Sequence, residues 1–258
     1  DACYIISHPS MHYAQVKECL MSDKHVLCEA PLALELAQCE ELIALANDRN
    51  VILMQGLKTA YSTAYSRLML LVKTGKIGDV VSVDSTCTSL RNPIVYSEEF
   101  FNNTWNTLCA WGPTALLPVL QILGSDYKSK QITTKFADEK TNYDLFTKID
   151  FVYDNAVASI KVAKGVKSEG ELIISGTKGY IYVPAPWWKT DYFEIRYENS
   201  QDNRRYFYQL DGEGIRYEIV AFAKAVETGR SIAYVDNDFV CSIGKIMESF
   251  YDGDIKKI

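Results

Sequence analysis

The hydrophobic pattern of this sequence changes character near Val80, and this change limits the folds open to the chain. Before about Gln55, short apolar runs alternate with segments whose apolar residues recur every three or four positions. That alternation is typical of βαβ units in a parallel sheet. After Val80, apolar residues alternate singly with polar ones, and turn residues separate these stretches. The pattern predicts an α/β chain, in which a small parallel sheet precedes an α+β part with a large, open, mostly antiparallel sheet.

The two periods also place the individual elements. In the first part we predict strands at Ala2 to Ser7, His25 to Cys28 and Val51 to Gln55, and helices at Met11 to Met21, at Glu35 to Asn50 and through Tyr61 and Val72, ending at Gly75. In the second part we predict strands at Ala156 to Val162 and Phe193 to Glu198, and a helix at Trp111 to Leu123.

Two further helices are expected near the end of the sequence, at Ile215 to Thr228 and Asp236 to Tyr251. Carboxylates at Asp236 and Asp238 suit a helix start. Because Ile215 to Thr228 carries an apolar stripe, we expect both helices to pack on the large sheet and to leave its other face uncovered and apolar. Turns at 177–179 and 211–214 are expected to join strands. An uncovered sheet face favours a homodimer or a higher homo-oligomer.

Composition excludes several classes of partner. The net charge is −6 and the isoelectric point is near 5.2, with Lys and Arg scattered, so we do not expect nucleic-acid binding. The apolar runs are too short to span a bilayer, so the expectation is no membrane association and a cytoplasmic location. The seven cysteines form no C-x-x-C pair and the three histidines lack ligands at metal-site spacing, which predicts reduced cysteines and no metal.

Four stretches carry a resemblance to a known family. They read YIISHPSMHY at residues 4–13, KHVLCEAPL at 24–32, GKIGDV at 75–80, and SGTKG at 175–179 together with GIRYE at 214–218. Together they resemble the Gfo/Idh/MocA oxidoreductases, with the dihydrodiol-dehydrogenase-like branch most similar in the last pair. The resemblance implies the C-terminal part of a Rossmann-like nucleotide-binding domain over residues 1–60 and an α/β substrate and oligomerisation domain over residues 61–258.

The resemblance also implies a cofactor, NAD or NADP, and a set of residues beside it. These cofactor-side positions are Ser7, His8, His12, Glu29 and Pro31. His12 has an alternative interpretation as a helix-start histidine whose nitrogens are satisfied by backbone. Glu29 is equally well explained as a structural hydrogen-bond partner. The sequence does not distinguish NAD from NADP and does not identify the substrate.

The chain departs from the family in its phosphate-binding residues. The family's G-x-G-x-x-G turn, which seats the cofactor pyrophosphate on a helix N-terminus, is absent from these residues. We therefore expect the chain to begin near the fourth Rossmann strand and not to bind NAD(P)(H) tightly.

Three positions that match the family's catalytic groups have also changed. The lysine of the family's "EKP" is Ala30 here, and the acidic and His or Tyr positions of the second catalytic stretch are Ala110 and Thr114. A methyl group carries no proton, and a hydroxyl is a poor general acid. We expect an NAD(P)-dependent oxidoreductase of a sugar- or diol-like alcohol that is inactive as this chain, or a non-catalytic descendant that serves binding, assembly or regulation.

Four more residues are candidates for the substrate side. Lys58 follows a predicted strand at the edge where ligands of open α/β sheets bind, so it is a possible substitute for the missing lysine, although a solvated surface lysine is the commoner case. Trp111, Trp187 and Trp188 are expected to line the substrate pocket. The last two have the alternative of packing a sheet edge.

Overall fold

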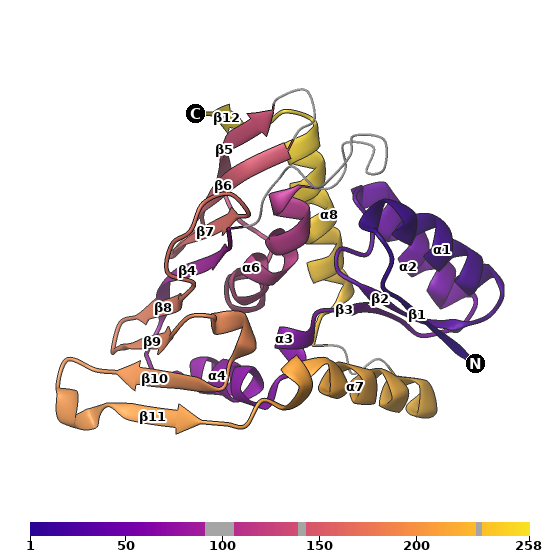
Figure 1. The fold of residues 1–258 in the computed structure, drawn as a ribbon. Helices are drawn as coiled ribbons and strands as arrows, with labels where there is room; N and C mark the ends of the chain where they lie inside the picture. The colour runs from indigo at the N-terminus through magenta and orange to yellow at the C-terminus, as the bar shows by residue number, and fades with distance from the viewer. Residues whose placement is uncertain (91–105, 139–142, 231–233) are drawn as a thin grey trace.

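The computed structural model describes residues 1–90, 106–138, 143–230 and 234–258, which form two sheets with helices between and beside them (Figure 1). The small sheet contains β1 (Ala2–Ile5), β2 (His25–Glu29) and β3 (Leu53–Gly56). The large sheet contains β4 (Val80–Thr88), β5 (Ser129–Asp138), β6 (Tyr143–Val152), β7 (Val157–Ala163), β8 (Leu172–Gly176), β9 (Tyr180–Val183), β10 (Tyr192–Arg196), β11 (Arg204–Phe207) and β12 (Lys256–Lys257).

The described helices surround the small sheet and cover one face of the large one. They are α1 (Pro9–Met21), α2 (Leu36–Asp48), α3 (Lys58–Tyr61), α4 (Thr63–Lys73), α6 (Thr107–Leu123), α7 (Ile215–Thr228) and α8 (Asn237–Tyr251), with short 3-10 turns η2 (Trp187–Lys189), η3 (Ser200–Asp202) and η4 (Asp211–Gly214). Across the parts of the chain that the structure describes, no helix is both long and apolar enough to cross a bilayer.

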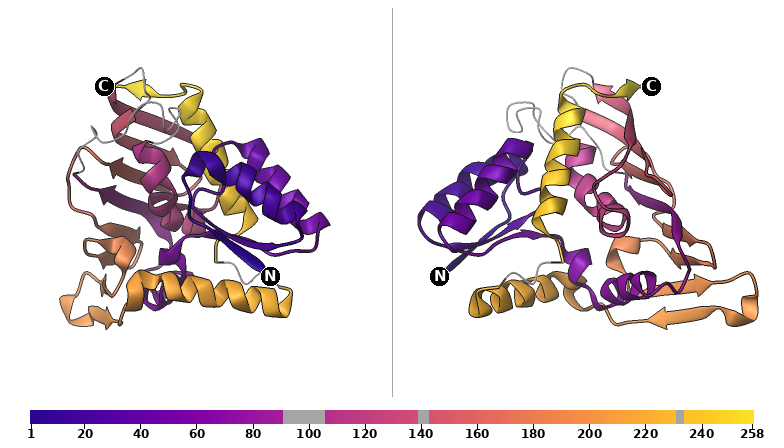
Figure 2. Two further views of the ribbon diagram at one scale, coloured as in Figure 1. Left: turned by 45° about the vertical axis from the view of Figure 1, so that its right-hand side comes forward. Right: turned by 180° about the vertical axis from the view of Figure 1, so that it is seen from behind.

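All three strands of the small sheet run parallel, as the sequence predicts. Cys3 pairs with Val26, and Cys28 pairs with Gln55, so the carboxyl ends of β2 and β3 lie side by side. On one face of this sheet lie α1 and α2, which bury Val16 and Leu42 among other residues. On the opposite side lies α7 (Figures 1 and 2).

The position of α7 corrects the expectation that both C-terminal helices cover the large sheet. Its bounds are those predicted, but it contacts α3, and Glu218 packs beside Gly56 at the end of β3. The other helix, α8, packs on α6 and α2. The 211–214 turn leads into α7 and does not join two strands. An apolar stripe predicts that a helix face is buried, but any apolar surface can bury it.

The large sheet is mixed, with the order β11-β10-β9-β8-β4-β7-β6-β5-β12. The β4–β7 and β5–β12 pairs are parallel, and the other pairs are antiparallel. Its inner face packs against α6, which contacts β4, β6 and β7. Inward residues such as Val83, Ile149 and Ile160 are fully buried. The sheet and α6 therefore share one core.

The start of α6 is fixed by buried polar residues, one turn earlier than the sequence predicts. The side chain of Asn106 accepts a hydrogen bond from the Cys109 N–H (2.7 Å) and caps the helix. On β6, the Asp144 carboxylate accepts from the Thr107 N–H (2.6 Å) and from the Thr147 hydroxyl (2.5 Å). Burial raises the pKa of Asp144 to about 6. These bonds tie the first turn of α6 directly to the sheet.

The outer face of the large sheet carries no described helix, as Figure 2 shows, but it is not uniformly apolar. Most residues that alternate with the buried ones on β5 to β7 are polar or charged, such as Gln131, Lys148 and Lys161, and the exposed Val152 and Val157 lie at one end of these strands. Exposed apolar side chains gather toward the other edge, where Phe207 is 73% exposed. The expectation of an apolar face is therefore wrong over β5 to β7, because strict alternation places the polar residues outward there.

Two of the sequence stretches that resemble the Gfo/Idh/MocA family meet in the fold. The Lys178 N–H donates to the carbonyl oxygen of Ile77 (2.9 Å), and the Thr177 N–H donates to that of Asp79 (3.0 Å). A Cβ atom on Gly176 would overlap the Ile77 carbonyl oxygen. The SGTKG turn thus joins β8 to the turn that leads into β4, and only glycine leaves room for this backbone contact.

We predict that Gly176→Ala destabilises the fold by about 2 kcal/mol or more, because the added methyl group must push two backbone segments apart. The matched control is Gly75→Ala, since Gly75 has a φ of 71° but no neighbouring atom within 4 Å of the added Cβ. That change should cost only about 1 kcal/mol of backbone strain. Urea unfolding of both variants measures the difference. Equal losses would contradict the proposed overlap.

Candidate functional site

A cavity of about 180 Å³ lies at the carboxyl end of the small sheet, between β2, α3, α6 and the start of α7. Its lining residues are Glu29, Ala30, Leu57, Lys58, Thr59, Ala110, Pro113, Thr114, Trp188 and Ile215. The structure therefore brings together all three positions that match the family's catalytic groups, together with the candidate lysine. The lining residues come from five separate segments, and two of these, 29–30 and 57–59, meet because the parallel strands β2 and β3 end at the same edge of their sheet.

The polar groups of this pocket differ in how they are held. The Glu29 carboxylate accepts a hydrogen bond from the Tyr4 hydroxyl. The Lys58 ammonium lies 3.0 Å from Glu213 Oε2, and the Lys189 ammonium also pairs with Glu213. Hydrogen bonds from Lys189 and Lys58 lower the pKa of Glu213 to about 2. Lys58 is thus a pocket residue and also one half of an ion pair.

The segment that presents Glu213 has an unusual backbone. Gly212, Glu213 and Gly214 all have positive φ values, of 55°, 56° and 90°. Glycine adopts this region freely, but a glutamate does not. The two ion pairs hold Glu213 in this conformation at the rim of the pocket.

The residues expected beside the cofactor surround the loop after β1. Both ring nitrogens of His12 face backbone carbonyls, with Nδ1 2.8 Å from the Pro31 oxygen and Nε2 3.0 Å from the Ser7 oxygen. His12 is buried, which matches its interpretation as a histidine satisfied by backbone. His8 accepts from the Ser10 N–H (3.3 Å) and caps α1, and burial lowers its pKa.

The three tryptophans have different roles in the fold. Trp187 is fully buried and donates from Nε1 to the Thr86 carbonyl oxygen (3.1 Å), so it packs the large sheet. Trp188 lines the pocket, and its ring lies 4.9 Å from that of Trp111. Trp111 therefore supports the pocket wall through Trp188.

Sequence reasoning missed a buried carboxyl beside this pocket. Glu218, in the first turn of α7, has no exposed surface, and neither of its oxygens has a hydrogen-bond partner among the described residues. Burial, followed by the nearby Glu29 carboxylate, raises the pKa of Glu218 to about 8. A glutamate in the first turn of a helix looks like a surface residue in the sequence. Nothing in the local pattern indicated its burial.

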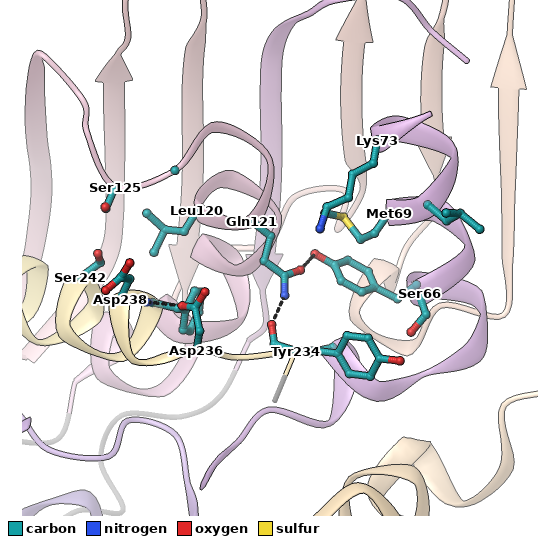
Figure 3. A pocket seen from close by; sticks show the side chains of 15 residues that line it. Ser66, Met69, Lys73, Leu120, Gln121, Ser125, Tyr234, Asp236, Asp238 and Ser242 are labelled. Carbon is teal, nitrogen blue, oxygen red and sulfur yellow. Dashed lines mark hydrogen bonds between the residues drawn. The ribbon is translucent and has the colours of Figure 1, made fainter. Parts of the chain in front are cut away.

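A larger cavity, of about 500 Å³, lies between α4, α6 and the start of α8 (Figure 3). There Gln121 accepts from the Tyr65 hydroxyl (3.0 Å) and donates to the Tyr234 carbonyl oxygen (2.5 Å). Asp236 accepts from the Phe239 N–H (2.8 Å), as expected for a helix start. By volume this larger cavity would be the better candidate for a ligand site. The ends of β2 and β3, and the residues that match family positions, lie instead at the cavity of about 180 Å³. We therefore place the candidate functional site at the smaller cavity.

Comparison with known proteins identifies the class of this fold. Residues 1–57 match the model of an oxidoreductase family with an NAD-binding Rossmann fold. A trans-1,2-dihydrobenzene-1,2-diol dehydrogenase from Xenopus tropicalis is 24% identical, over 94% of this chain and 76% of that protein. A frog relative of the same name, from Xenopus laevis, is 27% identical over 73% of this chain, which spans 57% of it.

Solved structures agree with this class. A 3-ketoreductase from Actinomadura kijaniata, in complex with NADP and TDP-benzene, superimposes on all of this chain and 79% of its own with a TM-score of 0.83 at 17% identity. An aldose-aldose oxidoreductase from Caulobacter crescentus covers 98% of this chain and 77% of its own, with a TM-score of 0.82 at 17% identity. The fold is the two-domain α/β fold that these solved structures share. The match over residues 1–57 and the dihydrodiol dehydrogenase relatives support the resemblance to the Gfo/Idh/MocA oxidoreductases.

We predict that Glu218→Gln changes how stability depends on pH. The folded-state pKa of Glu218 lies above the ordinary glutamate value of 4.5, so its protonated form stabilises the fold fully below pH 4.5, and this contribution is lost as the pH rises toward about 8. Glutamine does not ionise. The variant should therefore gain stability relative to the wild type between pH 5 and pH 9, by up to about 5 kcal/mol.

Urea unfolding at pH 5 and at pH 9 measures the difference in unfolding free energy between the variant and the wild type. The matched control is Glu41→Gln on the surface of α2, where Glu41 pairs with Lys17 at 2.6 Å. Because hydrogen bonds from Lys17 and Tyr13 lower the pKa of Glu41, its replacement should change stability little over this range. An unchanged gap between wild type and Glu218→Gln at the two pH values would disprove the assigned ionisation of Glu218.

Proposed function

We propose that the cavity at the end of the small sheet binds a small sugar- or diol-like alcohol. The observation that carries this proposal is the meeting of Glu29, Lys58 and Thr114 in one cavity at the carboxyl ends of parallel strands. Carboxylate, ammonium and hydroxyl groups all form hydrogen bonds with alcohol oxygens. The diol and aldose names of the relatives support this class of ligand. A cavity of about 180 Å³ suits a single small ring rather than a drug-sized molecule.

NAD or NADP would supply the hydride acceptor if it binds beside this cavity. The residues of this chain fit only the nicotinamide end of the cofactor. There the His12 ring lies between the carbonyl oxygens of Ser7 and Pro31 and packs the two strand-end loops against each other. A glycine-rich turn for the pyrophosphate is not among these residues. Weak cofactor binding by this chain follows from that difference.

The pocket lacks the groups with which the family moves the hydroxyl proton. Ala30 and Ala110 offer only methyl groups, and Thr114 a hydroxyl that is a poor general acid. The chain is therefore proposed to be a non-catalytic member that binds a ligand for assembly or regulation. One observation favours a second candidate, an active oxidoreductase: Lys58 lines the same cavity and carries a proton that an alcohol substrate can exchange.

We predict negligible NADH or NADPH formation by this chain with diols and aldoses, and little recovery in Ala30→Lys. A positioned acid or base contributes about 10²- to 10⁴-fold, and the lysine alone does not restore the groups missing at Ala110 and Thr114. Absorbance of the reduced cofactor measures turnover. A rate on the order of 1 per second that is lost in Lys58→Ala, but kept in the control Lys73→Ala on α4, would favour the second candidate.

A homodimer through the outer face of the large sheet is part of the proposal. Exposed aromatic side chains near β9 to β11 support it, among them Phe207 and Tyr180. We predict a dimer by light scattering at high micromolar concentration and a monomer for Phe207→Arg. The control Met21→Arg replaces an exposed apolar residue at the end of α1 and should remain dimeric. A wild-type protein that is strictly monomeric would contradict the dimer.

A further inference from the structure

The Glu29 carboxylate is a charged group of the pocket without a charged partner. Among the described residues it forms no ion pair, and its recorded hydrogen bond comes from the uncharged Tyr4 hydroxyl. The ammonium groups of Lys58, which lines the pocket, and of Lys189 both pair with Glu213. Among the described lining residues, the cation of this cavity is therefore already engaged by another carboxylate, and a bound cation could compensate the partly buried Glu29 carboxylate.

Near Glu29 lies a second carboxyl, that of Glu218, which is completely buried and whose two oxygens have no hydrogen-bond partner within the described parts of the chain. It packs against Gly56 at the end of β3, where its Oε1 lies 3.0 Å from the position of an added Cβ. The titratable groups that act on Glu218 or are acted on by it come from three elements: Tyr4 on β1, Glu29 on β2, and Lys58 and Tyr61 on α3. Only Lys58 among them is a cation, and it already has a partner.

We propose that the pocket selects a small amino alcohol, whose protonated amine binds the Glu29 carboxylate near Glu218. This inference rests on the proposed function, because it names the class of ligand for the same pocket. Ala30 lines the cavity next to Glu29 and leaves open the space that a longer side chain would fill. The ligand supplies the positive charge that this side chain does not carry. The hydroxyl of the ligand faces Lys58 and Thr114.

Ionisation of Glu218 provides a measurable effect, proton release on binding, that a ligand held only by packing contacts would not cause. At neutral pH the Glu218 carboxyl is mostly protonated, since burial raises its pKa to about 8. An ammonium group bound at Glu29 favours the charged form of a nearby carboxyl and lowers its pKa. Binding of the amine near pH 7 should therefore release up to about one proton from Glu218. Binding of an uncharged ligand should release none.

The test compares two probes that differ in one group, trans-2-aminocyclohexanol and trans-1,2-cyclohexanediol. Calorimetry at pH 7 should show at least about tenfold tighter binding of the amine to the wild type, because a partly desolvated ion pair adds to the hydrogen bonds that both probes form. Glu29→Gln should abolish this preference, whereas Glu41→Gln on α2 should keep it. Ala30→Lys should also abolish it, since the new ammonium group takes the place of the ligand's. Ala30→Met, similar in size but uncharged, should weaken both probes and keep their ratio.

Proton release is measured in the same experiment from binding heats in buffers of different ionisation enthalpy. The wild type should release a proton with the amine, and Glu218→Gln should bind the amine without releasing one. Equal binding of amine and diol, or a preference that persists in Glu29→Gln, would overturn the inference and leave the proposed function intact. A protein that binds neither probe would overturn both.

Discussion

The attachment of α6 to the large sheet is the constraint on which the rest of the structure depends. Asp144, buried on β6, accepts hydrogen bonds from the Thr107 N–H at the start of the helix and from the Thr147 hydroxyl of its own strand. A buried carboxyl is stable only when such donors compensate its lost hydration. Because α6 carries Ala110 and Thr114, this group anchors to the large sheet the helix end that presents both residues to the pocket.

This arrangement shows that the framework of the pocket does not depend on the side chains at positions 30, 110 and 114. Three contacts hold the elements around the pocket. Asp144 bonds to the start of α6, the 75–80 turn bonds to the 175–179 turn, and the His12 ring contacts the Pro31 carbonyl oxygen. None of these contacts involves the side chains at positions 30, 110 or 114. The side chains at these three positions can therefore differ without a change in the architecture, because the fold and the chemistry of the site rest on different residues.

Much of the fold can be predicted from the sequence, because its signals are local. The period of two on β10 and the stripe on α7 fix the type and extent of those elements, and Gly75 and Gly124 mark helix ends through their left-handed backbone. The partner of an element is not a local signal. The stripe of α7 gave no indication of which sheet it packs on, and the first turn of α6 depends on Asp144, which lies far away in the sequence.

The candidate site also contains residues that the sequence can place and residues that it cannot. A family pattern supplies the long-range information that periodicity lacks, and so the sequence can place positions 29, 30, 58, 110 and 114 in one site. The sequence cannot predict that Glu218 is buried, or that Trp187 is buried while Trp188 lines the pocket, because burial of a polar or aromatic side chain depends on tertiary packing. Adjacent tryptophans in one short turn point into different surroundings, one into the core and one toward the pocket.

The rim of the pocket has a property that follows from Glu213. Its left-handed backbone costs about 1 kcal/mol, and the groups that hold it, Lys58 and Lys189, come from different parts of the chain and reach it near the surface. Interactions between partly exposed charges weaken as ionic strength rises. The segment before α7 is therefore held most firmly in dilute solution, and rising salt loosens it. The mouth of the pocket thus responds to ionic strength, whereas the buried contacts that hold the pocket's other elements are screened much less.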